Sequence, residues 1–413
     1  MRIAYLTQSY PPMVSGASLA AKNLAENIAA RGHQVLVIAA SDRGESYRSV
    51  KEDLTVLRLH SIHNPLRVGQ RFLLYPRQTI LRSLREFNPD LIHTHEPLQM
   101  GIICLEHSHI ASIPAMLSIH QLPWFVSAYL PEIYGIRHIA ETGLWTYARW
   151  LLRQFNALIT PTQTITDIIS SMTGTTSHTI SYGIDLLEFH PHLSSDEETA
   201  TRQRLNLPPN VPIILHVGRL DTDKHVERVV LAAEKPLQET DAHLLIVGDG
   251  RQKPALMELC RSIGITQRCH FSGYISVQEG LPAIYRLASL FVTASEIETQ
   301  GIVLLEAAAS GLPIVAIRAT CIPEIVHDGV NGYLAEPGNV FALGQAMTSL
   351  LKQPEKAGIM GTAGRRLVEE HNIQITLDRY EHLYSTLIAQ NETYRKKVKA
   401  QNYWDRAREW MNL

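Results

Sequence analysis

The sequence predicts an α/β protein of two doubly wound domains, each a mostly parallel sheet with helices on both faces. Short runs rich in β-branched residues alternate with longer segments of helical periodicity, the pattern that parallel sheets covered by helices produce. The chain has 413 residues, and single domains cluster around ~100 to 200 residues. We therefore expect two Rossmann-like domains facing a central cleft, with ligands beyond the carboxyl ends of their strands.

In the first half, each expected strand is a short apolar run. These strands are residues 3–7, 34–39, 56–59, 91–95, 115–119 and 157–160. Helices fill the gaps between them. The first helix, residues 17–31, has apolar side chains at helical spacing, and Gly32 follows where a left-handed residue often ends a helix.

The second half repeats the alternation, with expected strands at 213–217, 244–247, 269–271, 290–293 and 314–316. The stretch 189–210 contains prolines and is polar and acidic, so we expect it to link the halves. This gives a first domain at 1–188 and a second at 189–375. Residues 376–413 form a helical extension, which must pack on something or remain loose.

Composition excludes several classes of protein. Hydrophobic residues make up 45% of the chain and charged residues 19%, as in ordinary globular proteins. The formal charge is -2, which gives no electrostatic case for nucleic-acid binding. The four cysteines lack the paired spacing of a zinc site, and they are too few for a disulfide scaffold.

The first apolar run is too short for a signal peptide, and no apolar stretch reaches the ~20 residues of a membrane span. We expect a cytoplasmic protein whose membrane contact, if it has any, is peripheral.

A glycine turn with two cations follows the expected strand 213–217. The loop has the sequence Gly218-Arg219-Leu220-Asp221-Thr222-Asp223-Lys224. A guanidinium can grip phosphate oxygens bidentately and an ammonium adds a point charge, so the pair suits a diphosphate. A solvated basic turn is an equally good explanation of this loop taken alone.

Two carboxylates eight residues apart follow the expected strand 290–293. Glu298 lies in the loop, and a helix beginning at Gly301 places Glu306 in its second turn. A buried carboxylate needs hydrogen-bond donors, which ribose hydroxyls supply. The amides of Gly301, Ile302 and Val303 would present a helix N-terminus to a sugar or phosphate. An isolated pair of this kind is also explained by acidic residues favouring the helix dipole.

These motifs stand in the order found in one enzyme family. The stretch from Glu298 through Glu306 continues as Ala307-Ala308-Ala309-Ser310-Gly311-Leu312-Pro313, and further landmarks are Gly218-Arg219 with Lys224, Val247-Gly248-Asp249-Gly250, Phe271-Ser272-Gly273 and Asn331-Gly332-Tyr333-Leu334. Over nearly its whole length the chain resembles the retaining glycosyltransferases of family 4, which have the GT-B architecture. Glu298-Thr299-Gln300-Gly301 is similar to diacylglycerol glucosyltransferases of the family, and phosphatidylinositol mannosyltransferase-like members are a further possibility.

The resemblance implies roles for individual residues. Arg219 and Lys224 would hold the pyrophosphate of a nucleotide-sugar donor, Glu306 the ribose, and Glu298 the transferred sugar. Gly218, Gly273, Gly301, Ile302 and Val303 would complete the donor site. In the first half, Gly16 lies where family members let the backbone approach the donor, and His120 resembles the histidine that faces the donor sugar. The helical extension would pack back on the first domain.

The sequence holds two patterns that suggest metal binding. The first is His93-Thr94-His95-Glu96. A metal site there would require the side chains of His93 and Glu96 to converge, but they point to opposite sides of a strand. We discount a metal here; because His95 and Glu96 lie at the end of the expected strand, they are candidate acceptor-site residues instead. Asp221-Thr222-Asp223 resembles a metal-binding Asp-x-Asp but lies inside the cationic loop, so Arg219 and Lys224 are expected to replace a cation. No metal and no other cofactor is expected.

Local composition is the only guide to the acceptor. Residues 48–90 contain eight Lys or Arg and four Asp or Glu, interleaved with Phe72, Leu73, Leu74 and Tyr75. The tail 392–413 has six basic and three acidic residues on an amphipathic pattern, and the segment 124–150 is rich in aromatic residues. These features favour an anionic membrane surface and a lipid acceptor such as diacylglycerol or phosphatidylinositol, although packing against the first domain would also explain them. The alternatives are a glycosyltransferase that acts on a soluble sugar or a cell-surface glycan intermediate, a GT-B epimerase or phosphorylase, and a non-catalytic nucleotide-sugar-binding protein. UDP-glucose and GDP-mannose are both open as donors, and so is the oligomeric state.

Overall fold

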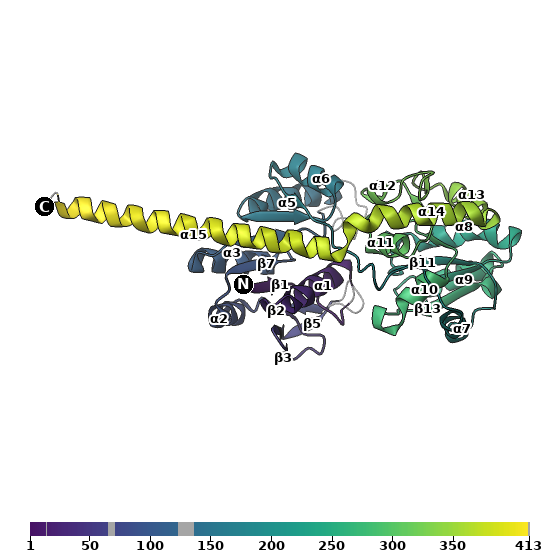
Figure 1. Cartoon of the computed structure of the whole chain (residues 1–413), viewed down its shortest axis with the longest axis horizontal. Helices are drawn as coiled ribbons and strands as arrows, with labels where there is room; N and C mark the ends of the chain where they lie inside the picture. The colour runs from purple at the N-terminus through teal and green to yellow at the C-terminus, as the bar shows by residue number, and fades with distance from the viewer. Residues whose placement is uncertain (14, 65–70, 123–135, 412–413) are drawn as a thin grey trace. The chain divides into compact units, whose positions relative to one another are not determined.

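The computed structural model describes residues 1–13, 15–64, 71–122 and 136–411, without the side chains of 136–137 and 394–411. The chain divides into two compact units (Figure 1). The first unit comprises Met1–Ile180 together with Thr376–Leu413, and the second unit comprises Ser181–Ile375. Each unit contains one main sheet and its own apolar core, so each is described by itself.

The first unit is built on an eight-stranded sheet of order β10-β9-β8-β7-β1-β2-β4-β3. Its strands are β1 (Arg2–Leu6), β2 (Gln34–Ala40), β3 (Tyr47–Lys51), β4 (Leu54–Leu59), β7 (Leu91–Thr94), β8 (Ala115–Ser118), β9 (Ala157–Thr160) and β10 (His178–Thr179). Every neighbouring pair is parallel except β3 with β4. The chain starts in the middle at β1 and builds outward in both directions, so a topological switch point lies between β1 and β7.

Helices cover this sheet because their apolar faces pack on its strands. They are α1 (Gly16–Ala30), α2 (Arg77–Phe87), α3 (Gln99–Ala111), α5 (Ile136–Leu152), α6 (Gln163–Thr173) and α15 (Ile373–Met411), beside a small hairpin of β5 (Ser61–His63) and β6 (Arg71–Leu73). In α1, Ser15 and Ser18 form a capping box in which each side chain bonds the other's backbone. Asn88 and Ser112 end α2 and α3 in left-handed conformations.

The long helix α15 completes the core of the first unit. Tyr380 and Tyr384 are buried there, and the Tyr384 hydroxyl lies 2.9 Å from the hydroxyl of Tyr5 on β1 and 2.9 Å from Nδ1 of His93 on β7. Arg31, after α1, bonds Asp378 and Glu381 of the same helix at 2.7 and 2.5 Å. The extension beyond residue 376 therefore belongs to the first unit.

The second unit has a six-stranded parallel sheet of order β13-β12-β11-β14-β15-β16. Its strands are β11 (Ile213–Val217), β12 (His243–Val247), β13 (Cys269–Gly273), β14 (Leu290–Val292), β15 (Ile314–Ile317) and β16 (Gly332–Ala335). In chain order this is the 3-2-1-4-5-6 arrangement of the dinucleotide-binding fold, whose switch point falls between the first and fourth strands. Here these strands are β11 and β14.

Helices lie on both faces of this sheet (Figure 1). They are α7 (Ser195–Arg204), α8 (Val226–Glu239), α9 (Lys253–Ser262), α10 (Leu281–Leu287), α11 (Ile302–Ala309), α12 (Ile322–Ile325), α13 (Val340–Lys352) and α14 (Pro354–Leu367). Along β11, Ile213 and Leu215 enter one apolar core and Ile214 the other. The strands are apolar almost throughout because both faces of the sheet are covered.

The region between the halves differs from a simple polar linker. The stretch 189–210 contains α7, which Ser194 caps through a hydrogen bond from Glu197 N. Phe189 and Leu207 flank this helix and are buried in the core of the second unit. Residues 181–188 also belong to the second unit, where Ile184 pairs with Asn372. The division between the units therefore falls after Ile180, eight residues before the position expected from composition, because composition does not register these contacts.

No helix among the described residues is both long enough and apolar enough to cross a membrane.

Candidate functional site

Four loops meet at the carboxyl edge of the second unit's sheet. They follow β11, β12, β13 and β14, which are neighbours and run parallel. The first residue of a loop bonds the last residue of the neighbouring strand, since Gly218 N donates to Val247 O of β12 at 3.0 Å and Gly248 N donates to Gly273 O of β13 at 2.8 Å. Both expected donor-site motifs, residues 218–224 and 298–306, lie at this edge or begin there.

The loops approach so closely that one position requires glycine. Gly248 has a φ of 143°, and a Cβ there would lie 1.8 Å from the carbonyl oxygen of Gly218. Any larger residue would push the loops after β11 and β12 apart, in a backbone conformation that only glycine adopts readily. The sequence landmark Val247-Gly248-Asp249-Gly250 is therefore a requirement of loop packing.

An ion pair spans the switch point of the sheet. Lys224 ends the short 3₁₀ turn Thr222–Lys224 after β11, and its Nζ donates to Glu298 Oε1 at 2.5 Å. Glu298 lies in the loop after β14. Both side chains are mostly buried, with 18% and 16% of their surfaces exposed. Lys224 and Glu298 are thus brought together although 73 residues separate them in the sequence.

The cations of the loop after β11 are neutralised by carboxylates. Arg219 bonds Asp221, and its Nη2 donates to Asp223 Oδ2 at 2.8 Å. Together with the Lys224–Glu298 pair, two cations face three carboxylates. A phosphate group would therefore have to compete with Asp221 and Asp223 for Arg219.

The segment between Glu298 and α11 is anchored by a glutamine that sequence reasoning missed. Gln300 is fully buried; its Oε1 accepts from Tyr182 N at 2.8 Å and its Nε2 donates to Ser181 Oγ at 2.7 Å. Gly301 then adopts a φ of 77° as the N-cap residue of α11, whose first two residues are Ile302 and Val303. Nothing in the sequence marks an uncharged side chain in an irregular loop as an anchor, because that role depends on partners that are distant in the chain.

Glu306 lies within α11 and is 8% exposed. The hydroxyl of Tyr285, on α10, donates to Glu306 Oε2 at 2.7 Å. Burial raises the pKa of Glu306 to about 7, and the bond from Tyr285 opposes that rise. The carboxylate therefore changes its charge near neutral pH. Tyr285 is a second residue that the sequence did not single out, because its apolar helix indicates only core packing.

In the first unit, the corresponding edge carries Gly16, His95, Glu96 and His120. Gly16 begins α1, and a Cβ there would meet no atom within 4 Å, so the approach to it is open. His95 follows β7 and His120 follows β8; His95 Nδ1 lies 2.8 Å from His120 Nε2. His95 is buried, and its ring stacks on that of His93 with centroids 4.4 Å apart.

Glu96 serves α3 directly. Its two carboxylate oxygens accept from Leu98 N at 2.6 Å and Met100 N at 2.9 Å, which satisfies amides at the beginning of the helix. Burial raises the pKa of Glu96 to about 7, against the effect of these bonds. A role for His95 or Glu96 at an acceptor stays a prediction.

Two family models together match most of the chain. The model for Glycosyltransferase Family 4 matches residues 14–187, and the model for Glycosyl transferases group 1 matches residues 197–367. The chain belongs to glycosyltransferase family 4. In this glycosyltransferase the first model covers most of the first unit and extends through residue 187 into the second, and the second model lies within the second unit.

Curated relatives of the glycosyltransferase include enzymes that are named for a lipid product or for a nucleotide-sugar donor. The chain is 29% identical over 384 residues to a sulfoquinovosyl transferase of Arabidopsis thaliana, covering 90% of this chain and 71% of that one. It is 25% identical over 400 residues to an alpha-monoglucosyldiacylglycerol synthase of Acholeplasma laidlawii, covering 95% and 98%. A GDP-mannose-dependent alpha-mannosyltransferase of Mycolicibacterium smegmatis is 28% identical over 392 residues, covering 94% and 98%.

Solved structures show that the fold of the glycosyltransferase is GT-B. A sucrose-phosphate synthase from Thermosynechococcus elongatus matches with a TM-score of 0.80 at 22% identity, covering 94% of this chain and 100% of that one. Anabaena HepE in complex with UDP-glucose matches with a TM-score of 0.73 at 20% identity and the same coverage. The expected α/β fold class is therefore confirmed.

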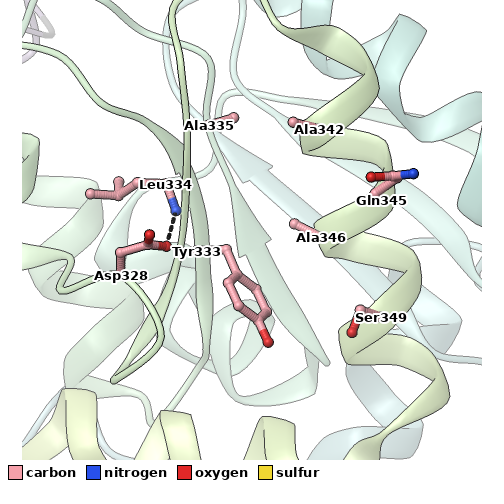
Figure 2. Close-up of a pocket in the computed structure, with 8 residues that line it drawn as sticks. All are labelled: Asp328, Tyr333, Leu334, Ala335, Ala342, Gln345, Ala346 and Ser349. Atoms are coloured by element: carbon pink, nitrogen blue, oxygen red, sulfur yellow. Dashed lines mark hydrogen bonds between the residues drawn. The ribbon is translucent and has the colours of Figure 1, made fainter.

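The second unit of the glycosyltransferase also has a pocket of about 360 Å³ between the edge strand β16 and α13 (Figure 2). Asp328, Tyr333, Gln345 and Ser349 supply its polar lining, and Asp328 Oδ1 accepts from Leu334 N at 2.9 Å. Through this bond the aspartate fixes the loop before β16. None of the expected site residues lines the pocket.

Proposed function

We propose that this glycosyltransferase transfers a hexose from a nucleotide sugar of the UDP-glucose or GDP-mannose type to a membrane lipid, with retention of anomeric configuration. The observation that carries the donor half is the Lys224–Glu298 pair at the switch point between β11 and β14. Ligands of doubly wound sheets bind at such a point. In this proposal Lys224 and Arg219 hold the pyrophosphate and Glu298 contacts the transferred sugar.

Donor binding would rearrange the ion pairs of the site. Phosphate oxygens would take Arg219 from Asp221 and Asp223, and Lys224 would share its charge between Glu298 and the leaving diphosphate. Both cations then offset charge that grows as the sugar–phosphate bond breaks. The amides of Gly301, Ile302 and Val303 add the N-terminus of α11, and Gly218 and Gly273 leave room for the phosphates.

The remaining donor contacts involve a carboxylate and a histidine. Glu306 would accept hydrogen bonds from the ribose hydroxyls through Oε1, while Tyr285 holds Oε2. In the first unit, Gly16 would admit the donor phosphate and His120 would bond a sugar hydroxyl. The mechanism assigns no metal, because Arg219 and Lys224 offset the leaving-group charge; addition of a chelator is therefore expected to leave turnover unchanged.

The relatives named as monoglucosyldiacylglycerol synthases support a lipid acceptor. A second support is an apolar patch on the first unit, comprising Leu74, Tyr75, Leu98 and Ile102. These side chains are 62%, 51%, 57% and 38% exposed. The two segments are neighbours because Gln99 Nε2 donates to Leu73 O at 3.2 Å. Exposed apolar side chains on a basic segment suit the interface of an anionic bilayer, so we propose peripheral attachment to the inner face of the cell membrane.

The test is a turnover assay with purified protein and a panel of nucleotide sugars, with and without vesicles that contain diacylglycerol or phosphatidylinositol. Released nucleotide and glycosylated lipid are both measured. Vesicle-dependent lipid product supports the proposal and names the donor. Product that appears only with a water-soluble acceptor would reject the lipid half, whereas nucleotide release or sugar isomerisation without transfer would reject the transferase mechanism.

Membrane contact has its own matched test. Leu74→Glu places a charge in the apolar patch, and Val50→Glu places the same charge on β3 at a side chain that is also 62% exposed. Binding to anionic vesicles should fall about tenfold or more for the first variant only, because a charged side chain disfavours burial in the interface. Equal binding by both would remove the patch from the proposal. Deletion of residues 393–413 tests the tail in the same assay; the side chains from residue 394 onward lie outside the described part of the chain.

A further inference from the structure

The contact between His95 and His120 is an edge-to-edge hydrogen bond. Nδ1 of His95 and Nε2 of His120 are 2.8 Å apart. The ring planes differ by 13° and the centroids are 5.1 Å apart. The centroid separation exceeds the nitrogen separation by about two ring radii. Each nitrogen therefore lies close to the line between the ring centres, and the rings meet edge to edge, nearly coplanar.

The surroundings hold the ring of His95 in this orientation. His95 N donates to Leu6 O on β1 at 2.8 Å. One face of the ring stacks on His93 at 4.4 Å, and the ring of Tyr5 lies 5.8 Å away. His93 is itself fixed by Tyr384 at Nδ1 and by Ser118 at Nε2. Rotation of His95 would therefore disturb a buried and fully bonded neighbour.

The other nitrogen of His95 decides the direction of the hydrogen bond. His95 Nε2 is buried and has no hydrogen-bond partner among the described residues. Burial keeps the pKa of both histidines well below the ordinary value, so each ring carries one N–H and one acceptor nitrogen. If His120 donated to His95, the proton of His95 would be on Nε2 as a buried donor without an acceptor. Such orphan donors are rarer than under-satisfied acceptors.

We infer that His95 is a positioning residue: its Nδ1–H donates to Nε2 of His120 and so places the single proton of His120 on Nδ1. His120 is thereby made a hydrogen-bond donor on its other edge. A donor suits an oxygen acceptor such as a sugar hydroxyl or a phosphate oxygen, and the other tautomer would present a lone pair there. The consequence for catalysis rests on the proposed function, whereas the tautomer itself does not.

The tautomer is tested by NMR of protein labelled with ¹⁵N in the histidine rings, with His120→Gln used to assign the signals. At a pH above 7 we expect His120 to be protonated at Nδ1 and bare at Nε2. In His95→Leu this preference should relax to a mixture of both tautomers. His95→Asn should retain it, because the amide nitrogen can occupy the place of Nδ1 and donate. A wild-type His120 with its proton on Nε2 would overturn the inference.

A second histidine pair provides a matched control. His243 Nδ1 and His270 Nε2 are also 2.8 Å apart, with centroids 5.1 Å apart. His243 begins β12, at the end of the sheet away from the carboxyl edge. Loss of that bond in His243→Leu should leave both turnover and the His120 spectrum unchanged.

The kinetic readout is the separation of kcat from KM for the donor. His95→Leu should lower kcat about tenfold, the equivalent of one hydrogen bond, with little change in KM, and His95→Asn should restore most of it. A loss in His95→Leu no larger than in His243→Leu would reject the positioning role. If the wild type transfers no sugar, the proposed function fails while the ring spectra still decide the tautomer.

Discussion

Glu306→Gln is expected to make the second unit more stable at alkaline pH while it impairs donor binding. Burial raises the pKa of Glu306 from 4.5 to about 7. In the unfolded chain this group loses its proton at lower pH than in the folded protein. The wild-type free energy of unfolding should therefore fall as the pH rises from 4.5 to 7. Glutamine has nearly the same shape, still accepts from the hydroxyl of Tyr285, and does not ionise.

The size of the effect follows from the shift. The pKa of about 7 in the folded protein lies about 2.5 above the ordinary value of 4.5, which corresponds to at most about 3 kcal/mol at about 1.4 kcal/mol for each pKa unit. For a unit of this size, each kcal/mol moves the unfolding midpoint by about 2 to 4 °C. Glu306→Gln should therefore raise the midpoint of the second unit by up to about 6 to 12 °C at pH 8, and by much less at pH 5.

The assay is thermal unfolding at both pH values, followed by calorimetry so that the two units can be resolved. Glu258→Gln is the control, because that side chain on α9 is 65% exposed, and its midpoint should not change with pH relative to wild type. In parallel, binding of a nucleotide sugar should weaken about tenfold or more, since a charged acceptor for the ribose is lost. A Glu306→Gln protein that is no more stable than wild type at pH 8 would refute this account of the buried carboxylate.

Three further substitutions test other contacts. Lys224→Met should lower kcat by about 100-fold or more, because it removes the positive charge that would stabilise the leaving diphosphate. A kcat within threefold of wild type would exclude that role. Gly248→Ala should lower the unfolding midpoint of the second unit and prevent donor binding. The added Cβ would lie 1.8 Å from Gly218 O, and the positive φ alone costs a non-glycine residue about 1 to 3 kcal/mol. Calorimetry checks the midpoint, and a donor titration checks binding. Tyr384→Phe should destabilise the first unit alone by about 1 to 3 kcal/mol, because it leaves buried Tyr5 and His93 short of a partner; an unchanged midpoint for that unit would contradict it.

The central strands were predictable because burial on both faces produces continuous apolar runs. Eleven strands expected from sequence coincide with observed strands to within about two residues, as 213–217 and 157–160 do fully. The strands β3, β5, β6, β10 and β16 were not expected. β3 is exposed along most of its length, and β10 has only two residues, so neither carries the apolar signal that marks a central strand.

The candidate site was predictable as a set of positions but not as a set of contacts. Lys224 and Glu298 follow strands that are adjacent in the sheet, and the expected topology places such loops on one edge. The pairing of Arg219 with Asp221 and Asp223 depends on the local fold of a short turn. Gln300 and Tyr285 acquire roles only through tertiary partners, for which a single sequence has no local pattern.

The first unit draws its core from both ends of the chain, with the whole second unit between them. During synthesis the ribosome delivers residues 181–375 before it delivers the part of α15 that covers Tyr5 and His93. The second unit can therefore finish folding first, although it comes later in the sequence, while the first unit waits with buried positions uncovered. A chain that stops after residue 375 would keep one complete unit and leave the other open to aggregation and proteolysis. Docking of α15 is thus the step that completes the first unit of this enzyme.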